Sequence, residues 1–480
     1  MLIPVFPFAD LQGNKKQAKI IIKRIFELKS KQGIDQSAQN FLQMQTKSGK
    51  SSTATKTIGI WICMSLVVGN MIGAGIFLLP TALAPFGGVS ILGWIASAVG
   101  ALMTALVFTR MSRRFPKQGG PYRYAYDNFG EFAGFSVAWS YWISIWCGNA
   151  AIAVASVTYL GFFWPVLQNS PPHAIAMTLM ILWTLTLLNT RGVREAGVFQ
   201  LITTVLKFIP LAVLGIAAFF VFDTEAFKPF NLSGEPLVSS LAATAALTLW
   251  AFSGLESATI PADQVDNPKS TIPKATLYGF IIAAIIYISS QVTIMSVVPN
   301  AELQQSGAPF ADAARILWGD TAATIIAIGA VISCLGALNG WILLQGQVPM
   351  TAARDGLLPK VFLDKNNEGV SIPALFISSI LISILVMANF SEGMLSLFTF
   401  ALLVSTLGFF IPYLLSIAAE LKLTLANWKN EKDYFILISA SSALIFYGWA
   451  ISGIGAKALW WGAGLVLAGV PIYLVMKYKK

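Results

Sequence analysis

Two charged side chains, Lys207 and Glu256, lie inside long apolar segments of the sequence. A charge without a partner in a bilayer costs about 3 kcal/mol or more, so each is a candidate functional group. Glu256 has the chemistry to pair with a cationic substrate or to take up a proton. Lys207 has the chemistry to supply a fixed or protonatable positive charge. Lys207 falls about twelve residues into its segment, which disfavours the alternative that it reaches the membrane surface.

Three glycines interrupt the first apolar segment in the run 69–77, which reads GNMIGAGIF. Glycine gains more backbone freedom than other residues on unwinding, so this run weakens a helix. An unwound turn leaves N–H and C=O groups that lipid cannot satisfy, so it persists only where it faces protein or a polar cavity. The alternative is a close helix–helix contact through small residues, and this run alone does not separate the two.

A second interruption lies in the segment 238–262, where Ser253 and Gly254 precede Glu256. This is the sixth predicted segment, five after the first, so the two cross the membrane in opposite directions, as in an inverted repeat. Interrupted helices at matching positions of two halves mark the binding site of a transporter near the membrane midplane. The correspondence favours a binding site over contact glycines.

The backbone groups at these two breaks suit an α-amino acid. N–H groups at the start of a half-helix, here those of Ala74, Gly75 and Ile76, suit a carboxylate. Carbonyl groups of an unwound turn near Trp250, Ala251 and Ser253 suit an ammonium. Aromatic side chains of the inner segments offer a cationic side chain about 2 kcal/mol of cation–π attraction when water is excluded. These aromatic residues are Tyr141, Trp142, Trp146, Trp250 and Trp341.

The composition places these groups in a polytopic membrane protein. The chain has 480 residues, of which 56% are hydrophobic and 11% charged, whereas soluble domains carry about 25% charged residues. Twelve apolar segments are long enough to span a bilayer: 58–83, 88–110, 131–163, 174–190, 196–222, 238–262, 274–298, 321–350, 372–389, 393–419, 432–452 and 457–476. The predicted fold is an all-α membrane protein of twelve transmembrane helices, arranged as a 5+5 inverted repeat plus two C-terminal helices, with helices one and six broken.

The positive charges orient the chain in the membrane. Of the 32 lysines and arginines, only Lys228, Arg315 and Lys457 fall in connections on the side opposite the N-terminal tail, and Lys207 falls within a segment. Cytoplasmic connections carry the excess of positive charge, so both termini are predicted to be cytoplasmic. This distribution also accounts for the net charge of +10 without nucleic acid. The predicted parts are a basic tail (1–56), either disordered or a short amphipathic helix, a first repeat (57–222), a second repeat (238–419) and two last helices (432–476).

No cofactor or metal site is expected. The three cysteines, Cys63, Cys147 and Cys334, fall in apolar segments, as small core residues do. The single histidine, His173, follows two prolines in a connection, where a solvated side chain is expected. The sequence contains no nucleophile–base pair or metal-ligand cluster that would indicate an enzyme.

Several motifs, in order, resemble the amino acid–polyamine–organocation superfamily over about residues 57–476. They are GNMIGAGIFLLP (69–80), PKQGGPY (116–122), Tyr141-Trp142, Trp146, Gly148-Asn149, LWAFSGLESA (249–258) and Asn267-Pro268-Lys269. Within the superfamily the chain is most similar to the basic amino acid/polyamine antiporters, which include arginine/agmatine, lysine/cadaverine and ornithine/putrescine exchangers. The stretches 308–315 and Gly340-Trp341 favour the arginine/agmatine member. The resemblance implies a LeuT-like fold.

The resemblance also implies roles for individual residues. Ala74 and Gly75 would bind the substrate carboxylate, and backbone groups near Ile72, Trp250, Ala251 and Ser253 the α-amino group. Trp341 would be the platform for the cationic side chain and Asn149 a polar contact for its head group. Further substrate contacts would be Asn70, Tyr141, Ser144 and Ser405. Gating residues would be Tyr141, Trp250, Glu256 and Tyr413, and proton or ion-site residues would be Glu256 and Lys207.

The chain departs from the family pattern at three places. Ala74 stands where the family often has serine, and Ser144 and Ile145 replace an Ala-Cys pair that lines the side-chain pocket of arginine exchangers. Lys207 is absent from the arginine/agmatine pattern and resembles the lysine at an ion-like site of proton-coupled or exchange-type amino acid transporters. The individual substrate therefore stays open.

The expected function is exchange of a cationic amino acid for its decarboxylated amine or another amino acid, by alternating access in a bacterial inner membrane. One alternative is a proton-coupled amino acid importer that uses Lys207 and Glu256. A second is a membrane sensor that binds the same ligand without moving it. The expected partners are the small-molecule substrate, a cationic amino acid or polyamine, and the lipid bilayer, and homodimer formation is left open.

Overall fold

The computed structural model describes residues 59–73, 75–116, 119–191, 208, 210–259, 262, 265–388, 393–430 and 432–478. The chain divides into two units, Met1–Lys56 and Thr57–Lys480. The predicted tail, Ala74 and Lys207 lie outside the described residues. The sequence-based expectations for them therefore stay predictions.

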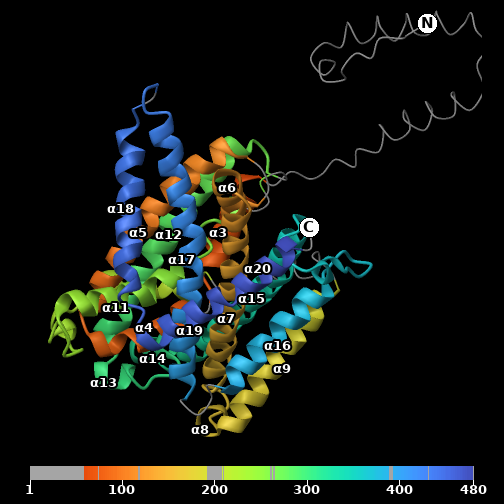
Figure 1. Cartoon of the computed structure of the whole chain (residues 1–480). Helices are drawn as coiled ribbons and strands as arrows, with labels where there is room; N and C mark the ends of the chain where they lie inside the picture. The colour runs from red at the N-terminus through yellow and green to blue at the C-terminus, as the bar shows by residue number, and fades with distance from the viewer. Residues whose placement is uncertain are drawn as a thin grey trace, which may run out of the picture. The chain divides into compact units, whose positions relative to one another are not determined.

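The described part of the second unit consists of helices, without a β-strand among its described residues (Figure 1). Continuous apolar runs form helices in a membrane because a helix satisfies its own backbone groups. In chain order the α-helices are α3 (Ile60–Met71), α4 (Gly75–Leu83), α5 (Val89–Arg114), α6 (Gly120–Phe129), α7 (Glu131–Leu160), α8 (Val166–Asn169), α9 (Pro171–Asn189), α11 (Leu237–Leu249), α12 (Pro268–Val297), α13 (Asn300–Leu303), α14 (Pro309–Trp318), α15 (Asp320–Arg354), α16 (Ile372–Ala388), α17 (Met394–Ala426), α18 (Tyr434–Ile451), α19 (Ala456–Leu467) and α20 (Gly469–Tyr478). Short 3-10 helices include η4 (Trp250–Phe252) and η5 (Ser257–Thr259).

Ten helices among the described residues are long and apolar enough to cross a membrane. Two shorter apolar helices, Pro210–Val221 and Ile372–Ala388, lie within the fifth and ninth predicted segments. The all-helical membrane architecture expected from the sequence is therefore confirmed. The count of twelve spans and the inverted repeat stay predictions.

Both predicted helix breaks are present. α3 ends at Met71, Ile72 leaves helical geometry with ψ 84°, and α4 begins at Gly75. The second break follows α11 and η4, where Ser253 is extended with ψ 141° and Gly254 has φ +100°. Each break therefore lies inside an apolar span, as the glycines and the matching positions predicted.

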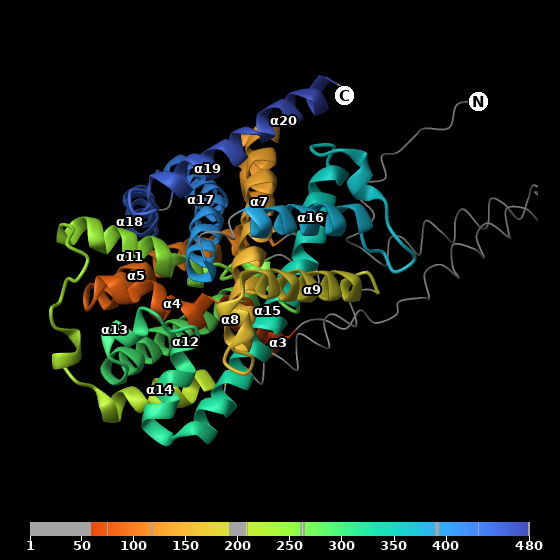
Figure 2. The same ribbon diagram turned by 90° about the horizontal axis from the view of Figure 1, so that it is seen from below.

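α7 carries much of the candidate site, and 89% of an 18-residue apolar stretch of this helix is buried inside the protein. Figure 2 shows it between α17 and α15, and it packs against both. Two glycines allow α17 to approach closely: a Cβ on Gly148 would lie 3.0 Å from Ser405 Oγ, and one on Gly408 would lie 2.8 Å from Ser144 Cβ. Small residues permit such close helix contacts in membranes.

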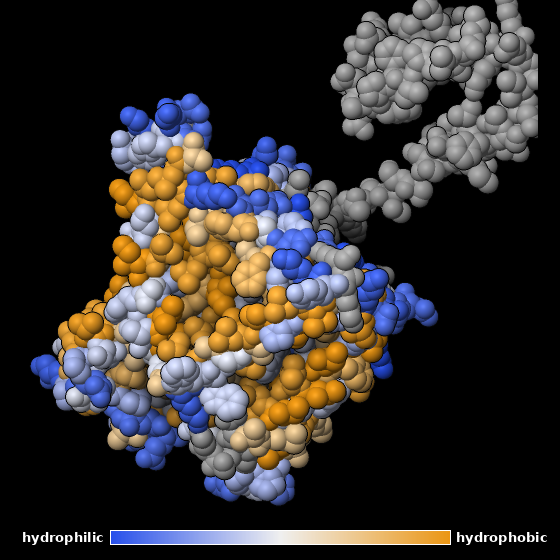
Figure 3. Space-filling model, in the orientation of Figure 1, coloured by the Kyte–Doolittle hydropathy of each residue, from blue (hydrophilic) through white to orange (hydrophobic). Residues whose placement is uncertain are grey.

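The surface agrees with a membrane environment. On the face in Figure 3, hydrophobic residues cover much of the helical region, and hydrophilic residues gather toward its edges. Exposed large side chains such as Phe219, Phe220 and Trp460 are 85%, 83% and 77% accessible, which suits contact with lipid.

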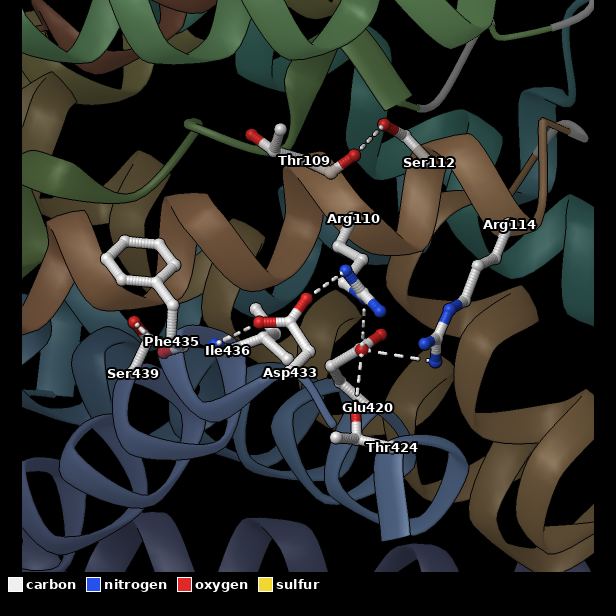
Figure 4. A network of polar contacts seen from close by, with 10 residues as sticks. All are labelled: Thr109, Arg110, Ser112, Arg114, Glu420, Thr424, Asp433, Phe435, Ile436 and Ser439. Atoms are coloured by element: carbon white, nitrogen blue, oxygen red, sulfur yellow. Dashed lines mark hydrogen bonds and ion pairs between the residues drawn. The ribbon is translucent and has the colours of Figure 1, made fainter. Parts of the chain in front are cut away.

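An ionic network joins the ends of α5, α17 and α18 (Figure 4). Glu420 is fully buried, and its Oε1 lies 3.1 Å from Arg110 Nε and 3.1 Å from Arg114 Nη1. Arg110 also pairs with Asp433, whose other carboxylate oxygen accepts from the N–H of Ile436 at 3.1 Å and caps α18. Basic residues on which the predicted membrane orientation rests therefore also tie three helix ends together.

Candidate functional site

The two helix breaks contact each other. Gly254 has φ +100°, in the left-handed region that favours glycine, and a Cβ there would lie 3.1 Å from the carbonyl carbon of Asn70. The Asn70 side chain donates to Ser257 Oγ at 2.8 Å. This glycine contact and this side-chain hydrogen bond help to hold the unwound turns together, so the first and sixth predicted spans meet at their breaks.

Trp250 covers the start of α4. A Cβ on Gly75 would lie 2.1 Å from Trp250 Cζ3, so the indole ring occupies the space beside this glycine. The indole N–H of Trp250 donates to Ser405 Oγ at 2.9 Å, and Ser405 donates to the carbonyl oxygen of Ser144 at 2.7 Å. These contacts bring together residues from four predicted spans. Ser144 takes part through its carbonyl, since its hydroxyl donates to Tyr141 O at 2.7 Å.

Glu256 is fully buried beside this contact and is held by neutral donors. The Tyr141 hydroxyl donates to Oε1 at 2.7 Å, the Tyr413 hydroxyl to Oε2 at 2.6 Å, and the Gly254 N–H to Oε2 at 3.1 Å. Among the described residues, no lysine or arginine forms an ion pair with it. Of the four predicted gating residues, three therefore meet at one carboxylate.

Aromatic rings connect this carboxylate to α15. Phe409 lies 5.4 Å from Tyr141, 6.2 Å from Tyr413 and 5.8 Å from Trp341, measured between ring centroids. Sequence analysis missed Phe409. A signal was present, because Ser405, Phe409 and Tyr413 recur every four residues and therefore share one face of α17.

A cavity of about 80 Å³ begins at Tyr141 and runs between α6, α7 and α15. Tyr122 lines it from α6, and its hydroxyl donates to Asp355 at the end of α15. Burial, followed by the hydrogen bond and the charge of Asp355, raises the pKa of Tyr122, so this tyrosine stays a neutral donor. The cavity is lined by Gly119, Pro121, Tyr122, Val137, Ala138, Tyr141, Leu344, Gln347, Val348 and Thr351.

The other end of α4 packs against α7 and α14. The Tyr159 hydroxyl donates to Phe77 O at 2.9 Å and accepts from the Phe310 N–H at 3.3 Å. The rings of Phe77 and Phe310 lie 5.0 Å apart, and Thr81 donates to Ser306 O at 2.9 Å. Buried rings and hydrogen bonds therefore hold α4 against α7 and α14 on the side of the breaks opposite the cavity.

Two of the predicted amine-binding carbonyls, those of Trp250 and Ala251, already have partners. Trp250 O accepts from Ser253 N at 3.0 Å and from Ser253 Oγ at 2.6 Å, and Ala251 O accepts from the Tyr287 hydroxyl at 3.1 Å. Tyr287 was not foreseen from the sequence. Each carbonyl has two lone pairs, so an ammonium would share Ala251 O with Tyr287 or displace it. The assignment of these carbonyls to the α-amino group stays a prediction.

Asn149 and Trp341 lie on facing helices. The Asn149 side chain donates to Gln345 Oε1 at 2.7 Å, and both residues are fully buried. Gln345 follows Trp341 by one turn of α15, so both project from one side of that helix. Gln345 was missed at the sequence level, although a glutamine in an apolar span is itself a signal of function.

The chain is similar to known proteins over most of its length. A family model described as "Amino acid permease" matches residues 58–476. The cadaverine/lysine antiporter of Escherichia coli (strain K12) is 33% identical over 434 residues, which cover 89% of this chain and 96% of that protein. The arginine/ornithine antiporter of Pseudomonas aeruginosa is 32% identical over 447 residues, covering 89% and 92%. The putrescine transporter PotE of Haemophilus influenzae is 32% identical over 431 residues, covering 89% and 99%.

Proposed function

Because the chain belongs to the amino acid permease family, we propose that it is a secondary transporter that exchanges a cationic amino acid for its decarboxylated amine or another amino acid by alternating access. The family resemblance drawn from the motifs is confirmed. Relatives named as cadaverine/lysine and arginine/ornithine antiporters support arginine, lysine or ornithine as the amino acid. The relative named as a putrescine transporter supports an amine as the exchanged partner.

The observation that carries this proposal is the contact between the two helix breaks, with Trp250 over Gly75. The N–H groups at the start of α4 would hold the substrate carboxylate, because a half-helix start carries partial positive charge. Backbone carbonyls at Ile72, Trp250, Ala251 and Ser253 would hold its α-amino group. Substrate beside Gly75 requires the Trp250 ring to move, which gives Trp250 the role of a gate.

The cationic side chain would extend toward α15. There Trp341 offers an aromatic face and Asn149 a polar group, while Asn70, Ser144 and Ser405 complete the contacts proposed from the family pattern. Tyr141 and Tyr413 would act as gates because both hold Glu256 and both contact Phe409. Substrate binding then shifts the equilibrium between the inward-open and outward-open forms.

The cavity supports an opening of this form of the protein toward the cytoplasm. It runs from Tyr141 toward Tyr122 and Thr351, and Tyr122 donates to Asp355, at the start of a connection that also carries Lys360 and Lys365. Positively charged connections lie in the cytoplasm. We therefore assign the cavity to the cytoplasmic side of a bacterial inner membrane, with both termini cytoplasmic and substrate entry from inside.

A second candidate function is proton-coupled amino acid import. It is favoured by Glu256, a buried carboxylate that has only neutral donors among the described residues. Such a group takes up a proton more readily than one that is paired with a cation, because no positive charge stabilises its ionised form. Lys207 would be the second titrating group, and its placement lies outside the described residues.

Proteoliposomes distinguish the two functions. Purified protein is reconstituted with unlabelled lysine, arginine, ornithine, cadaverine or putrescine inside, and uptake of labelled lysine, arginine or ornithine is measured. We expect uptake that requires internal substrate and proceeds without a pH gradient. Uptake into empty vesicles that depends on an inward proton gradient would instead support the importer. No uptake of any cationic amino acid under either condition would overturn both.

A further inference from the structure

A chain of four hydrogen bonds runs from α9 through α16 and α15 to α7. On α9, Thr186 Oγ1 lies 2.8 Å from the carbonyl oxygen of Leu182. Ser379 Oγ lies 2.7 Å from Thr186 Oγ1, and Gln345 Nε2 lies 3.1 Å from Ser379 Oγ. Gln345 Oε1 lies 2.7 Å from Asn149 Nδ2. The four side chains that form this chain are all fully buried.

This row of hydrogen bonds has a direction, because each hydroxyl has one proton to donate. Thr186 gives its proton to the Leu182 carbonyl, so Ser379 donates to Thr186. The oxygen of Ser379 then accepts from the NH₂ end of Gln345. The carbonyl end of Gln345 is left facing the NH₂ end of Asn149. If every donor and acceptor were exchanged, Thr186 would donate to Ser379 and the Leu182 carbonyl would lose its hydrogen bond from Thr186. This loss costs most in a buried site, where no water can replace the lost donor.

This direction leaves the carbonyl end of Asn149 free. Asn149 Oδ1 is buried and has no hydrogen-bond partner in the described part of the chain. A buried acceptor of this kind calls for an explanation, and one explanation is a ligand that donates to it. The position of Asn149 is consistent with contact to a substrate, because the preceding residue, Gly148, borders the proposed gate. A Cβ on Gly148 would lie 3.5 Å from the Trp250 ring. Trp341 lies one turn before Gln345 on the facing helix.

We propose that Thr186, Ser379 and Gln345 are positioning residues that fix the Asn149 amide so that its carbonyl oxygen accepts from the side-chain head group of the substrate. This inference rests on the proposed exchange function and specifies its selectivity. An ammonium or guanidinium carries only donors, whereas an apolar head group offers none. The hydrogen-bond direction set by α9 thereby selects cationic over neutral side chains, without any charge on the four residues.

The test measures selectivity in reconstituted full-length protein. Lysine and norleucine compete against a labelled cationic amino acid, and the ratio of their inhibition constants reports recognition of the ε-ammonium. Thr186→Val keeps the side-chain shape and removes the hydroxyl, whereas Thr186→Ser keeps the hydroxyl and removes a methyl. We expect the ratio to fall about five- to tenfold in Thr186→Val, as for the loss of one oriented hydrogen bond, and to hold in Thr186→Ser.

A second pair of variants tests the same chain on α16. Ser379→Ala removes the link between Thr186 and Gln345, and the ratio is expected to fall as in Thr186→Val. Ser378→Ala is the matched control, because Ser378 is also fully buried but accepts from the indole of Trp142 instead. Gln345→Met supplies a third variant if either of the first two fails to fold, as judged by size-exclusion chromatography.

The outcomes separate this inference from the function on which it rests. Folded Thr186→Val and Ser379→Ala proteins that keep the wild-type ratio within about twofold overturn the inference and leave exchange standing. An equal fall of the ratio in Thr186→Ser or Ser378→Ala also overturns the inference, because the fall would then come from altered packing and not from the lost hydrogen bond. A wild-type protein that does not prefer lysine to norleucine overturns it as well. A wild-type protein that takes up no cationic amino acid overturns both proposals.

Discussion

The indole ring of Trp250 lies against the α-carbon of Gly75, so close that a single methyl group on Gly75 would overlap the ring at 2.1 Å. The ring is fixed from its other side by the hydrogen bond from its N–H to Ser405. Trp250 therefore occupies the space in which a carboxylate would reach the N–H groups of α4. Under the proposed function, transport requires this ring to move, and the absence of a side chain at position 75 gives the ring room where it lies.

Gly75→Ala is expected to abolish exchange. The added Cβ would displace the Trp250 ring from the position that its hydrogen bond to Ser405 holds, and would crowd the substrate carboxylate. Uptake of a labelled cationic amino acid into preloaded proteoliposomes should fall at least about tenfold, with a destabilisation of about 1–3 kcal/mol. Gly448→Ala is the control, because a Cβ there would meet nothing within 4 Å. If Gly75→Ala takes up substrate as fast as Gly448→Ala, the contact between Gly75 and Trp250 has no role in exchange.

Gly254→Ala tests the contact between the two helix breaks. The residue must hold φ +100° and its new Cβ would lie 3.1 Å from the backbone of Asn70. The strained φ costs about 1–2 kcal/mol and the clash adds to it. Gly455→Ala separates the two terms, since Gly455 has φ +80° with nothing within 4 Å. We expect a larger drop in the thermal unfolding midpoint for Gly254→Ala, together with lost substrate binding, and equal drops would mean that the contact contributes nothing.

Glu256→Gln is expected to remove the pH dependence of exchange, because glutamine does not titrate over the range in which uptake is measured. Tyr141→Phe and Tyr413→Phe each remove one donor from the carboxylate. Losing a donor changes the balance between its charged and neutral forms, so the midpoint of the pH profile should move in each variant. Tyr447→Phe is the control, since this buried hydroxyl contacts Thr104. A Glu256→Gln protein with the wild-type pH profile would rule out Glu256 as the titrating group.

The sequence predicted the features that depend on local chemistry. Glycines mark the breaks at Gly73 and Gly254, and a carboxylate in an apolar span marks Glu256, because each violates a rule that lipid enforces on every spanning helix. Tyr141, Glu256 and Tyr413 are three of the four gating residues predicted through the family pattern, and the structure places them in contact.

The features that the sequence did not predict depend on how helices approach each other. The spacing of Phe409 from Ser405 and Tyr413 places it on one helix face, but its contacts with Tyr141 and Trp341 form only when α17 packs beside α7 and α15. Tyr287 donates to the carbonyl of Ala251 only because α12 passes the second break. The hydrogen bond between Asn149 and Gln345 joins residues 196 positions apart. Such pairings follow from tertiary packing, which hydrophobic periodicity does not specify.

Glu420→Gln tests whether the ionic network stabilises the helix ends. The variant removes a fully buried charge and leaves Arg110 and Arg114, whose side chains are 24% and 25% exposed, without their shared partner. Partial exposure of the arginines moderates the penalty, so we expect about 1–3 kcal/mol of destabilisation and a lower thermal unfolding midpoint in detergent. Substrate affinity should be unchanged in the folded fraction, because the network lies apart from the helix breaks.

The matched control for this variant is Glu225→Gln, which removes an equivalent charge from an exposed pair. Glu225 and Lys228 lie 2.7 Å apart, with side chains 71% and 67% exposed. An exposed pair of this kind contributes about 0–1 kcal/mol, since water and salt screen it, so the unfolding midpoint should hardly move. Equal midpoints for the two variants would show that burial of Glu420 between two arginines adds no stability beyond that of a surface pair.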